Sequence, residues 1–233
     1  MKAIGPPPPP PGHEGSTVEL PRAPSRGTGA RLWLARHARV DASWTPVAYG
    51  ALDVPLSAEG EEDTLRLGEA LGALPVGRVI SSDLARARRL GERVAAISGA
   101  ELHATSGLRE MDRGEWQGLP KEEFLARWTA EAEQYWRDPY RWRAPGGEGD
   151  EVLFARAWPE VEVGLAAVDG GTLVLTAHGQ LIRVLIGRML GLGVPESYAH
   201  YLDPAHASCL VDSPAGWRVE AQNLGAAELG ARA

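Results

Sequence analysis

Short runs of consecutive apolar residues, each ending abruptly at polar residues, are the clearest pattern along the chain. The run 32–35 ends at Arg36 and His37, and the run 172–177 ends at His178. Apolar runs of this length without a helical period are typical of buried strands. In open α/β sheets, ligands bind at the carboxyl ends of the strands. We therefore expect both histidines to lie at one shared site.

Between these two runs, apolar residues recur at helical spacing. Ser57 is placed to cap a helix whose core face includes Leu67 and Leu71. After a short strand at 79–81, Asp83 is predicted to cap a second helix. The predicted buried face of that second helix consists of Leu90, Val94 and Ile97. Alternating strands and helices predict an α/β fold with a mostly parallel sheet.

The second half of the chain has a different pattern. Residues 121–143 are helical in spacing and unusually aromatic, and 144–149 form a Pro/Gly-rich break. The aromatic residues fit either a core or a cap beside a pocket. Helices are then predicted at 150–168 and after Gly179, and a closing pair of strands at 207–211 and 217–221.

The two ends of the chain differ in composition from the middle. Residues 1–29 contain the proline run 6–11 and little apolar surface, so we expect a disordered Pro/Gly-rich tail. Residues 30–223 are predicted to form the folded domain. Residues 224–233 are predicted to be a frayed C-terminus.

Composition and charge limit the kinds of molecule that the protein is expected to bind. Of the 233 residues, 44% are apolar and 24% are charged, which is ordinary for a soluble globular protein. The formal net charge of −7 disfavours nucleic acid and acidic membranes as partners. The single cysteine, Cys209, allows no internal disulfide. With no apolar run of membrane-spanning length and no secretory signal, we expect a cytoplasmic location. The sequence predicts no oligomeric state.

The charged and titrating residues at the predicted strand ends indicate an anion site. Arg36, Arg86 and His178 present donors that match phosphate oxygens, and Gly179 allows a ligand to approach a helix N-terminus. A neutral imidazole beside bound phosphate, such as His37, is a competent nucleophile toward phosphorus. The sequence thus predicts a small phosphorylated substrate.

Two other interpretations of the histidines remain open at this point. A histidine at a strand end is often a structural residue. A metal site built from His37, His178 and an acid is conceivable, but no short-range ligand spacing supports it. We therefore expect no metal and no other cofactor.

Several segments resemble the motifs of the histidine phosphatase superfamily, the phosphoglycerate-mutase-like fold. Arg36-His37-Ala38 resembles its Arg-His-Gly motif, and 176–179 resembles its second histidine motif. The remaining matches are 53–57, 81–87, 108–110, 114–118 and 145–148. The resemblance covers most of the folded chain and implies three layers, with a mostly parallel sheet flanked by helices and a helical cap at 119–149.

The resemblance also implies roles for individual residues. His37 attacks phosphorus and forms a phosphohistidine, while Arg36, Arg86 and His178 hold the phosphoryl oxygens. Glu110 protonates the leaving oxygen and then deprotonates the attacking water. If Glu110 is not the general acid, the next candidates for that role are Asp112 and Glu115.

This chain departs from the family pattern at three places, one of which is 86–91, where the usual threonine-alanine ending of the second arginine motif is absent. Ala38 replaces the usual glycine, so its methyl group is expected to crowd the phosphate. Residues 40–44 lack the usual threonine and asparagine. The favoured function is a cofactor-independent phosphomonoesterase acting on a small metabolite. The alternatives are a phosphoglycerate mutase, for which 121–143 is aromatic rather than densely basic, and a non-catalytic phosphate-binding module.

Overall fold

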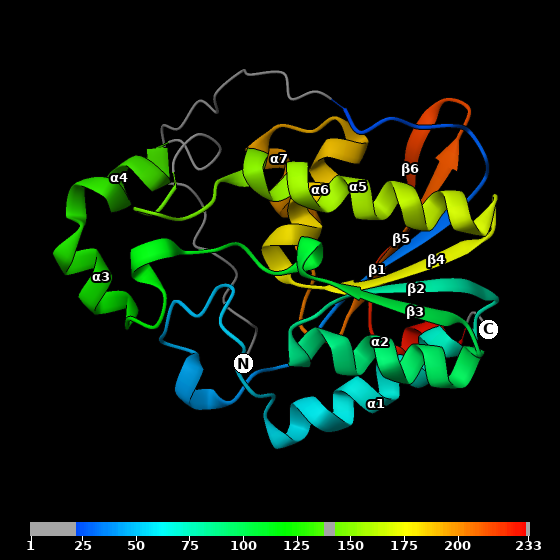
Figure 1. Cartoon of the computed structure of the whole chain (residues 1–233), viewed down its shortest axis with the longest axis horizontal. Coiled ribbons are helices and arrows are strands. Elements are labelled where there is room, and N and C mark those ends of the chain that lie inside the picture. Colours follow the sequence, from blue (N-terminus) through cyan, green and yellow to red (C-terminus); the bar gives the residue numbers. More distant parts are fainter. Residues whose placement is uncertain (1–21, 138–142, 232–233) are drawn as a thin grey trace.

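The computed structural model describes residues 22–137 and 143–231, and its centre is a six-stranded sheet with the order β3-β2-β4-β1-β5-β6 (Figure 1). Strands β1 to β4 are mutually parallel, and β5 and β6 complete one edge in antiparallel pairing. The strands are β1 (Arg31–Arg36), β2 (Val76–Ser82), β3 (Glu101–Thr105), β4 (Thr172–Ala177), β5 (Ala207–Ser213) and β6 (Gly216–Leu224). The predicted α/β class with a mostly parallel sheet is confirmed.

Helices cover both faces of the sheet and so make three layers (Figure 1). One face carries α1 (Ala58–Gly72), α2 (Ala85–Ser98) and α8 (Ala226–Gly230). The other carries α5 (Asp150–Val168), α6 (Gly179–Leu190) and the short α7 (Val194–Ser197). The pair α3 (Lys121–Arg127) and α4 (Thr129–Arg137) lies apart from the sheet, on the side toward which the parallel strands point (Figure 1).

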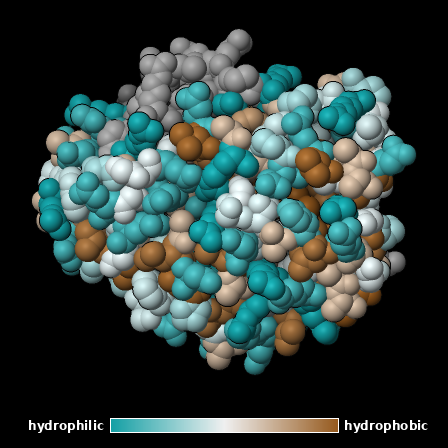
Figure 2. Space-filling view, viewed as in Figure 1, coloured by the Kyte–Doolittle hydropathy of each residue, from teal (hydrophilic) through white to brown (hydrophobic). Residues whose placement is uncertain are grey.

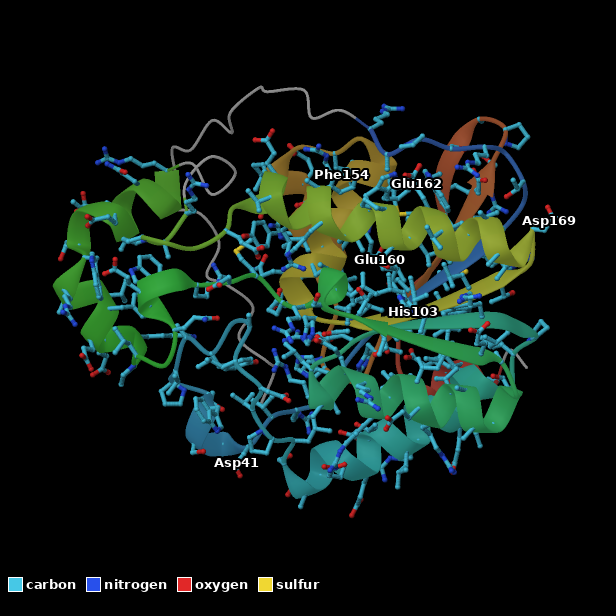
Figure 3. All side chains as sticks on the ribbon, viewed as in Figure 1. Asp41, His103, Phe154, Glu160, Glu162 and Asp169 are labelled. Carbon is cyan, nitrogen blue, oxygen red and sulfur yellow. The ribbon has the colours of Figure 1, made fainter. Side chains whose placement is uncertain are left out.

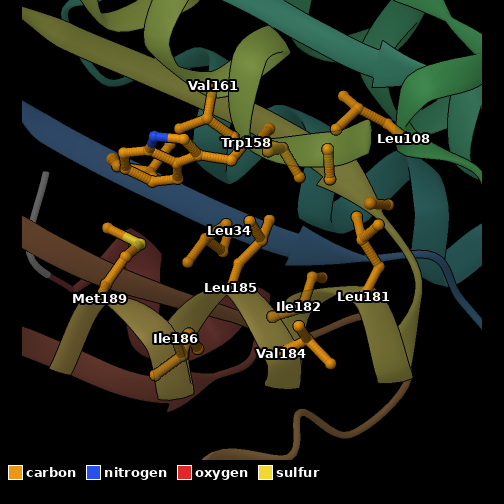
Figure 4. Packing of buried hydrophobic residues seen from close by; sticks show 14 of the residues in the cluster. Leu34, Leu108, Trp158, Val161, Leu181, Ile182, Val184, Leu185, Ile186 and Met189 are labelled. Atoms are coloured by element: carbon orange, nitrogen blue, oxygen red, sulfur yellow. The ribbon is translucent and has the colours of Figure 1, made fainter. Parts of the chain in front are cut away.

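Alternating side chains of the strands divide the core in two. Leu32 and Leu34 of β1 face α5 and α6, where Leu34 packs near Trp158 and Leu185 (Figure 4). Trp33 and Ala35 face α1 and α2 instead. Because both faces are buried, β1 reads as a continuous apolar run rather than as an alternating one. The same holds for β4, all six of whose residues are buried.

Three sequence predictions concern the N-terminal caps and the buried face of helices α1 and α2. Ser57 caps α1, since its hydroxyl accepts a hydrogen bond from Gly60 N–H at 3.0 Å. Asp83 was wrongly predicted to cap α2, because its carboxylate binds the Arg109 guanidinium and Leu84 takes the cap position. Ile97 was wrongly placed on the buried face of α2 and is 42% exposed, since its neighbour on α1 is Gly72, the last residue of that helix, which has no side chain to cover it.

The predicted chain ends need correction where the structure describes them. Residues 22–29 do not form a free tail but are bound to the domain. The Asp212 carboxylate accepts hydrogen bonds from the backbone N–H groups of Arg26, Gly27 and Thr28 at 3.0 Å each. The C-terminus is not frayed throughout, because α8 buries Leu229 against the core. Residues 1–21, including the proline run, lie outside the described residues.

The edge strand β3 was missed by sequence reasoning, because most of its side chains are exposed and it has no apolar run. Large apolar side chains at the surface are scattered, as Figure 2 shows for one face. The exposed ones are Leu65, Ile97, Leu125, Val152 and Val163. None of the helices within residues 22–137 and 143–231 combines the length and the apolar character needed to cross a membrane.

Candidate active site

The two histidines meet at the carboxyl ends of neighbouring strands. In the parallel pairing of β1 with β4, Arg36 lies opposite Ala177, so His37 and His178 follow at the same level. Their ring centroids are 5.1 Å apart, with the planes inclined at 60°. Both rings are buried, with 3% and 0% of their surface exposed. The sheet topology thus brings together two residues that are 141 positions apart.

Arg36 enters the site as the last residue of β1. Its Nη1 donates to the Leu202 carbonyl at 2.6 Å, and its guanidinium stacks over the Tyr201 ring at 4.9 Å. Its Nε is buried and has no hydrogen-bond partner among the described residues. Buried donors normally have a partner, so this nitrogen is suited to receive an anionic ligand.

Arg86 enters from the first turn of α2, with 1% of its surface exposed. Its Nη1 and Nη2 donate to the carbonyls of Leu52 and Gly50 at 2.6 and 2.8 Å, and Tyr49 lies under the guanidinium at 5.3 Å. Its Nε donates a hydrogen bond to His37 Nε2 at 3.4 Å. The guanidinium is therefore held by its outer nitrogens and turns its inner edge toward the imidazole.

Both imidazoles are held in the neutral form. Burial lowers the pKa of His37 well below its usual 6.5, and the positive charges of Arg86 and Arg36 lower it further. Burial likewise lowers the pKa of His178, followed by the effects of Arg86, His37 and Arg36. A neutral imidazole has a free lone pair, which a nucleophile needs.

The acid predicted from the sequence lies at the N-terminus of α6. Oε2 of Glu110 accepts a hydrogen bond from Gln180 N–H at 3.1 Å, and Oε1 accepts from Leu181 N–H at 3.2 Å. This places the carboxylate next to Gly179, the first residue of the helix. Burial lowers the pKa of Arg86 and raises that of Tyr201, and the charge of Glu110 partly offsets the first shift and adds to the second. Glu110 therefore lies at the edge of the anion site.

The two reserve candidates for the acid are placed differently. The Asp112 carboxylate is bound to its own loop, where Oδ1 accepts a hydrogen bond from Gly114 N–H at 2.8 Å. Glu115 is exposed. Glu110 is thus the one of the three whose carboxylate lies against α6.

Gly179 is tightly enclosed. A Cβ atom at this position would lie 2.5 Å from the Tyr201 hydroxyl oxygen and 3.1 Å from Arg36 Cζ. Only glycine fits without displacing these two side chains. Glu110 takes the N–H groups of the next two residues and leaves that of Gly179 for a bound anion.

The departures from the family pattern have little effect on the pocket. The Ala38 methyl group is buried in the core cluster with Trp33 and Leu67, so it does not crowd the phosphate position as the sequence led us to expect. Asp41 lies in an outer loop, where it accepts hydrogen bonds from the backbone N–H and hydroxyl of Ser43.

Several partners in the site were not found from the sequence. Ser82 contacts His178 Nε2 through its hydroxyl at 2.8 Å, and Asp53 accepts a hydrogen bond from Ala85 N–H at the start of α2. Tyr49 and Tyr201 stack on the two guanidinium groups. Ser82 and Asp53 lie within the matched segments 81–87 and 53–57 but were given no role there, whereas the two tyrosines lie in loops outside every matched segment.

The aromatic region forms a separate small core. Phe124 of α3 stacks on Trp116 with ring centroids 4.4 Å apart, and both are buried. For these residues the core interpretation holds. Tyr140 and Trp142 lie outside the described residues.

The arrangement is a buried set of hydrogen-bond donors around a neutral imidazole. Nδ1 of His178, like Nε of Arg36, has no partner among the described residues. Two guanidinium groups, an imidazole N–H and a helix N-terminus suit a phosphoryl group. Residues 22–137 and 143–231 contain no cluster of three or more His, Cys, Asp or Glu side chains that would hold a metal ion.

Comparison with known families agrees with this geometry. The family model of the histidine phosphatase superfamily (branch 1) matches residues 32–225. The chain belongs to the histidine phosphatase superfamily. Its Arg-His pair, second arginine and second histidine lie together, as the resemblance in the sequence implied.

Relatives in this superfamily carry different activities in their names. A probable phosphoglycerate mutase GpmB of Salmonella choleraesuis is 30% identical over 167 residues, which cover 70% of this chain and 75% of the relative. A mycobacterial glucosyl-3-phosphoglycerate phosphatase is 29% identical, with a TM-score of 0.75 and coverage of 84% and 99%. The α-ribazole phosphatase of Shigella flexneri has the same fold, at 21% identity, a TM-score of 0.72 and coverage of 83% and 96%.

Proposed function

We propose that this protein is a cofactor-independent phosphomonoesterase that works through a phosphohistidine at His37. The observation that carries the proposal is the pair of buried, unpartnered donors, Arg36 Nε and His178 Nδ1, beside the neutral His37 imidazole. A bound phosphoryl group satisfies both donors and lies next to the nucleophile.

In the first step, His37 Nε2 attacks phosphorus in line, and the bond from phosphorus to the ester oxygen breaks. Arg36, Arg86 and His178 stabilise the charge on the phosphoryl oxygens, and Glu110 gives its proton to the departing oxygen. In the second step, Glu110 takes a proton from water, whose oxygen attacks phosphorus and releases phosphate from His37. Positioning and electrostatics supply most of the acceleration.

The role of Glu110 is tested by the leaving group. Glu110→Gln should slow transfer from an alkyl phosphate by about 10²- to 10⁴-fold, the scale of general acid catalysis. The loss on p-nitrophenyl phosphate should be clearly smaller, because nitrophenolate departs without a proton. The measurement is the single-turnover rate of phosphoenzyme formation, since dephosphorylation can limit steady-state turnover.

Arg86→Lys is the control for this test. It keeps the charge but loses the fork that holds Gly50 and Leu52, and it acts on the phosphoryl group that both esters share. Both substrates should therefore lose rate to the same extent. Equal losses for Glu110→Gln as well would count against the acid role and leave Asp112 and Glu115 as candidates.

Metal removal is a separate test. The proposed mechanism uses the guanidinium groups of Arg36 and Arg86 where a metal ion would otherwise bring positive charge. Phosphate release should therefore continue unchanged in excess EDTA. Loss of activity that zinc or magnesium restores would favour a metal-dependent hydrolase.

Phosphoglycerate mutase activity is the second candidate, and the name of the Salmonella relative favours it. Mutase chemistry requires that the phosphoenzyme survives until the product has reoriented. Incubation with 3-phosphoglycerate separates the two, because a mutase yields 2-phosphoglycerate whereas a phosphatase yields glycerate and phosphate. The third candidate is a non-catalytic phosphate-binding module, to which the replacement of the usual glycine by Ala38 pointed, and the packing of Ala38 in the core cluster argues against it.

Our proposals for the substrate class, the binding partners and the cellular location rest on the sequence. We expect a small phosphorylated metabolite as substrate, no nucleic-acid or membrane partner, and a cytoplasmic location. A screen of phosphorylated metabolites for phosphate release identifies the substrate, and the phosphoglycerate derivatives come first because a structural relative is named for one.

A further inference from the structure

The loop that carries Glu110 is held from outside by one guanidinium group. Arg156 of α5 donates from Nη1 to the Gly107 carbonyl at 2.8 Å. From Nη2 it donates to the carbonyls of Arg109 and Glu110 at 2.8 and 3.1 Å. On the same helix Glu160, which Figure 3 labels, accepts a hydrogen bond from the Thr105 hydroxyl at 2.9 Å, so this face of α5 lies against the segment that precedes Glu110. The backbone carbonyl of Glu110 is thus bonded directly to Arg156.

Glu148 completes the arrangement from the other side. Its Oε1 and Oε2 accept hydrogen bonds from Arg156 Nε and Nη2 at 2.8 and 2.9 Å. Oε2 also accepts from Asp112 N–H at 3.0 Å, and the Glu148 N–H donates to the Asp112 carbonyl at 2.9 Å. The chain is therefore held at Gly107, Arg109 and Glu110 and again at Asp112, which fixes both sides of Glu110.

This pair is better suited to positioning than an ordinary surface ion pair. The side chains of Arg156 and Glu148 are 23% and 19% exposed, and both nitrogens of the fork are engaged. Burial by itself raises the pKa of Glu148, but the hydrogen bonds from Arg156 and Asp112 hold it below its usual value. A planar fork fixes direction as well as distance, which an ammonium group does not.

We propose that Arg156 and Glu148 form a positioning pair, which sets the place of the Glu110 carboxylate at the N-terminus of α6. The inference rests on the proposed function, because it assigns these residues to the acid of that reaction. A shift of about 1 Å in a reacting group costs on the order of 10²-fold in rate. The pair does not contact the histidines or the phosphoryl donors, and Arg156 acts on His178 only through its positive charge, which lowers the His178 pKa after the larger effects of burial and Arg86. Arg156→Lys keeps that charge, so its effect should fall on proton transfer.

The test uses Arg156→Met, Arg156→Lys and Glu148→Gln in the full chain, with single-turnover phosphorylation by an alkyl phosphate and by p-nitrophenyl phosphate. On the alkyl ester, Arg156→Met should lose about 10- to 100-fold. The loss on the nitrophenyl ester should be less than about threefold, as for a leaving group that needs no acid. Arg156→Lys should recover part of the loss, and Glu148→Gln should show the same substrate dependence.

Two controls separate positioning from loss of stability. Arg78→Met removes an arginine of matched exposure, 24%, which pairs with Glu101 away from the strand ends of the site, and it should leave both rates unchanged. Inhibition by inorganic phosphate should be the same in Arg156→Lys as in the wild type, because the phosphate donors are untouched. A partly unfolded protein would bind phosphate more weakly.

The double variant Arg156→Lys with Glu110→Gln should be no slower on the alkyl ester than Glu110→Gln alone, since both act on one proton transfer. Equal losses on the two esters for the Arg156 variants, or losses that add to those of Glu110→Gln, would overturn the positioning role while leaving the acid itself in place. If Glu110→Gln shows no leaving-group dependence, the assignment of the acid fails and the positioning role fails with it.

Discussion

The ends of β1 and β4 carry the same residue at the same level of the sheet, yet they hold it in different ways. His37 and His178 are both buried, neutral and close to Arg86. In His37, the ring nitrogen Nδ1 contacts the carbonyl of Ala38 at 2.7 Å. In His178, the engaged nitrogen is Nε2, which contacts the Ser82 hydroxyl at 2.8 Å. The two rings therefore present opposite nitrogens to the site.

This difference assigns the two histidines to different tasks. A carbonyl oxygen only accepts, so His37 Nδ1 carries the proton and Nε2 keeps the lone pair. Ser82 Oγ accepts a hydrogen bond from Leu84 N–H at 3.2 Å and has its own proton available to donate to His178 Nε2. We assign the hydrogen bond in this direction because it leaves the buried, unpartnered Nδ1 as the donor to a bound anion. His178 then carries its proton on Nδ1 and is a donor. One ring is prepared to attack phosphorus and the other to hold a phosphoryl oxygen.

The largest effect that tests this comparison comes from deleting each ring. His37→Ala should reduce phosphate release by more than about 10³-fold, because no other group replaces a nucleophile. His178→Ala should lose about 10²- to 10³-fold, the scale for one donor to a developing oxyanion. Acid-labile, base-stable phosphate should be trapped on wild type and on His178→Ala, and not on His37→Ala.

Circular dichroism of both variants checks that the fold is retained. Protein-bound phosphate on His37→Ala, or its turnover above a few per cent of wild type, would contradict the assignment of the nucleophile. Trapping on neither variant would show that the two rings act as one unit.

A smaller effect tests what sets the proton on His178. Ser82→Ala frees Nε2, so the ring is no longer fixed as an Nδ1 donor. We expect about a tenfold loss in kcat, which corresponds to about 1.4 kcal/mol and lies within the range for one lost hydrogen bond. Ser81→Ala is the matched control, since Ser81 is also fully buried but bonds to Thr176 and to the Ser82 carbonyl. Similar losses for the two serines would indicate a packing effect instead.

Much of this comparison could be predicted from the sequence, because β1 and β4 are buried on both faces. That burial makes each a continuous apolar run, and the residues that end the runs are those the core excludes. The helix face of α1 and the strand pair β5 and β6 followed from local patterns in the same way.

The remaining features depend on contacts between distant segments. The carbonyls of Gly50 and Leu202, which hold the two guanidinium groups, are backbone atoms that any residue would supply. Asp212 binds residues 26–28 across 184 or more positions, so composition alone assigned that segment to a tail. The edge strand β3 has its side chains in solvent and gives no apolar run.

The smallest expected effect is on the pH dependence of the free energy of unfolding. It tests the property that the two histidines share, which is a lowered pKa. The pKa of each ring is lower in the folded protein than its usual 6.5, so above that pH both states are neutral and stability does not change. As the pH falls below 6.5, the two histidines bind protons in the unfolded chain but not in the folded protein, so the free energy of unfolding decreases.

We expect a loss of about 1 kcal/mol for each histidine between pH 7.5 and pH 5.5, measured by urea unfolding. The paired carboxylates Asp83 and Asp212 have lowered pKa values and add their own losses only at more acidic pH. Burial also lowers the pKa of His200, which adds to the decrease in the same pH range. His37→Gln and His178→Gln should each remove about 1 kcal/mol of the decrease. A free energy of unfolding that stays constant over this range would show that neither ring has a lowered pKa in the folded protein, and it would remove the common property on which the division of tasks depends.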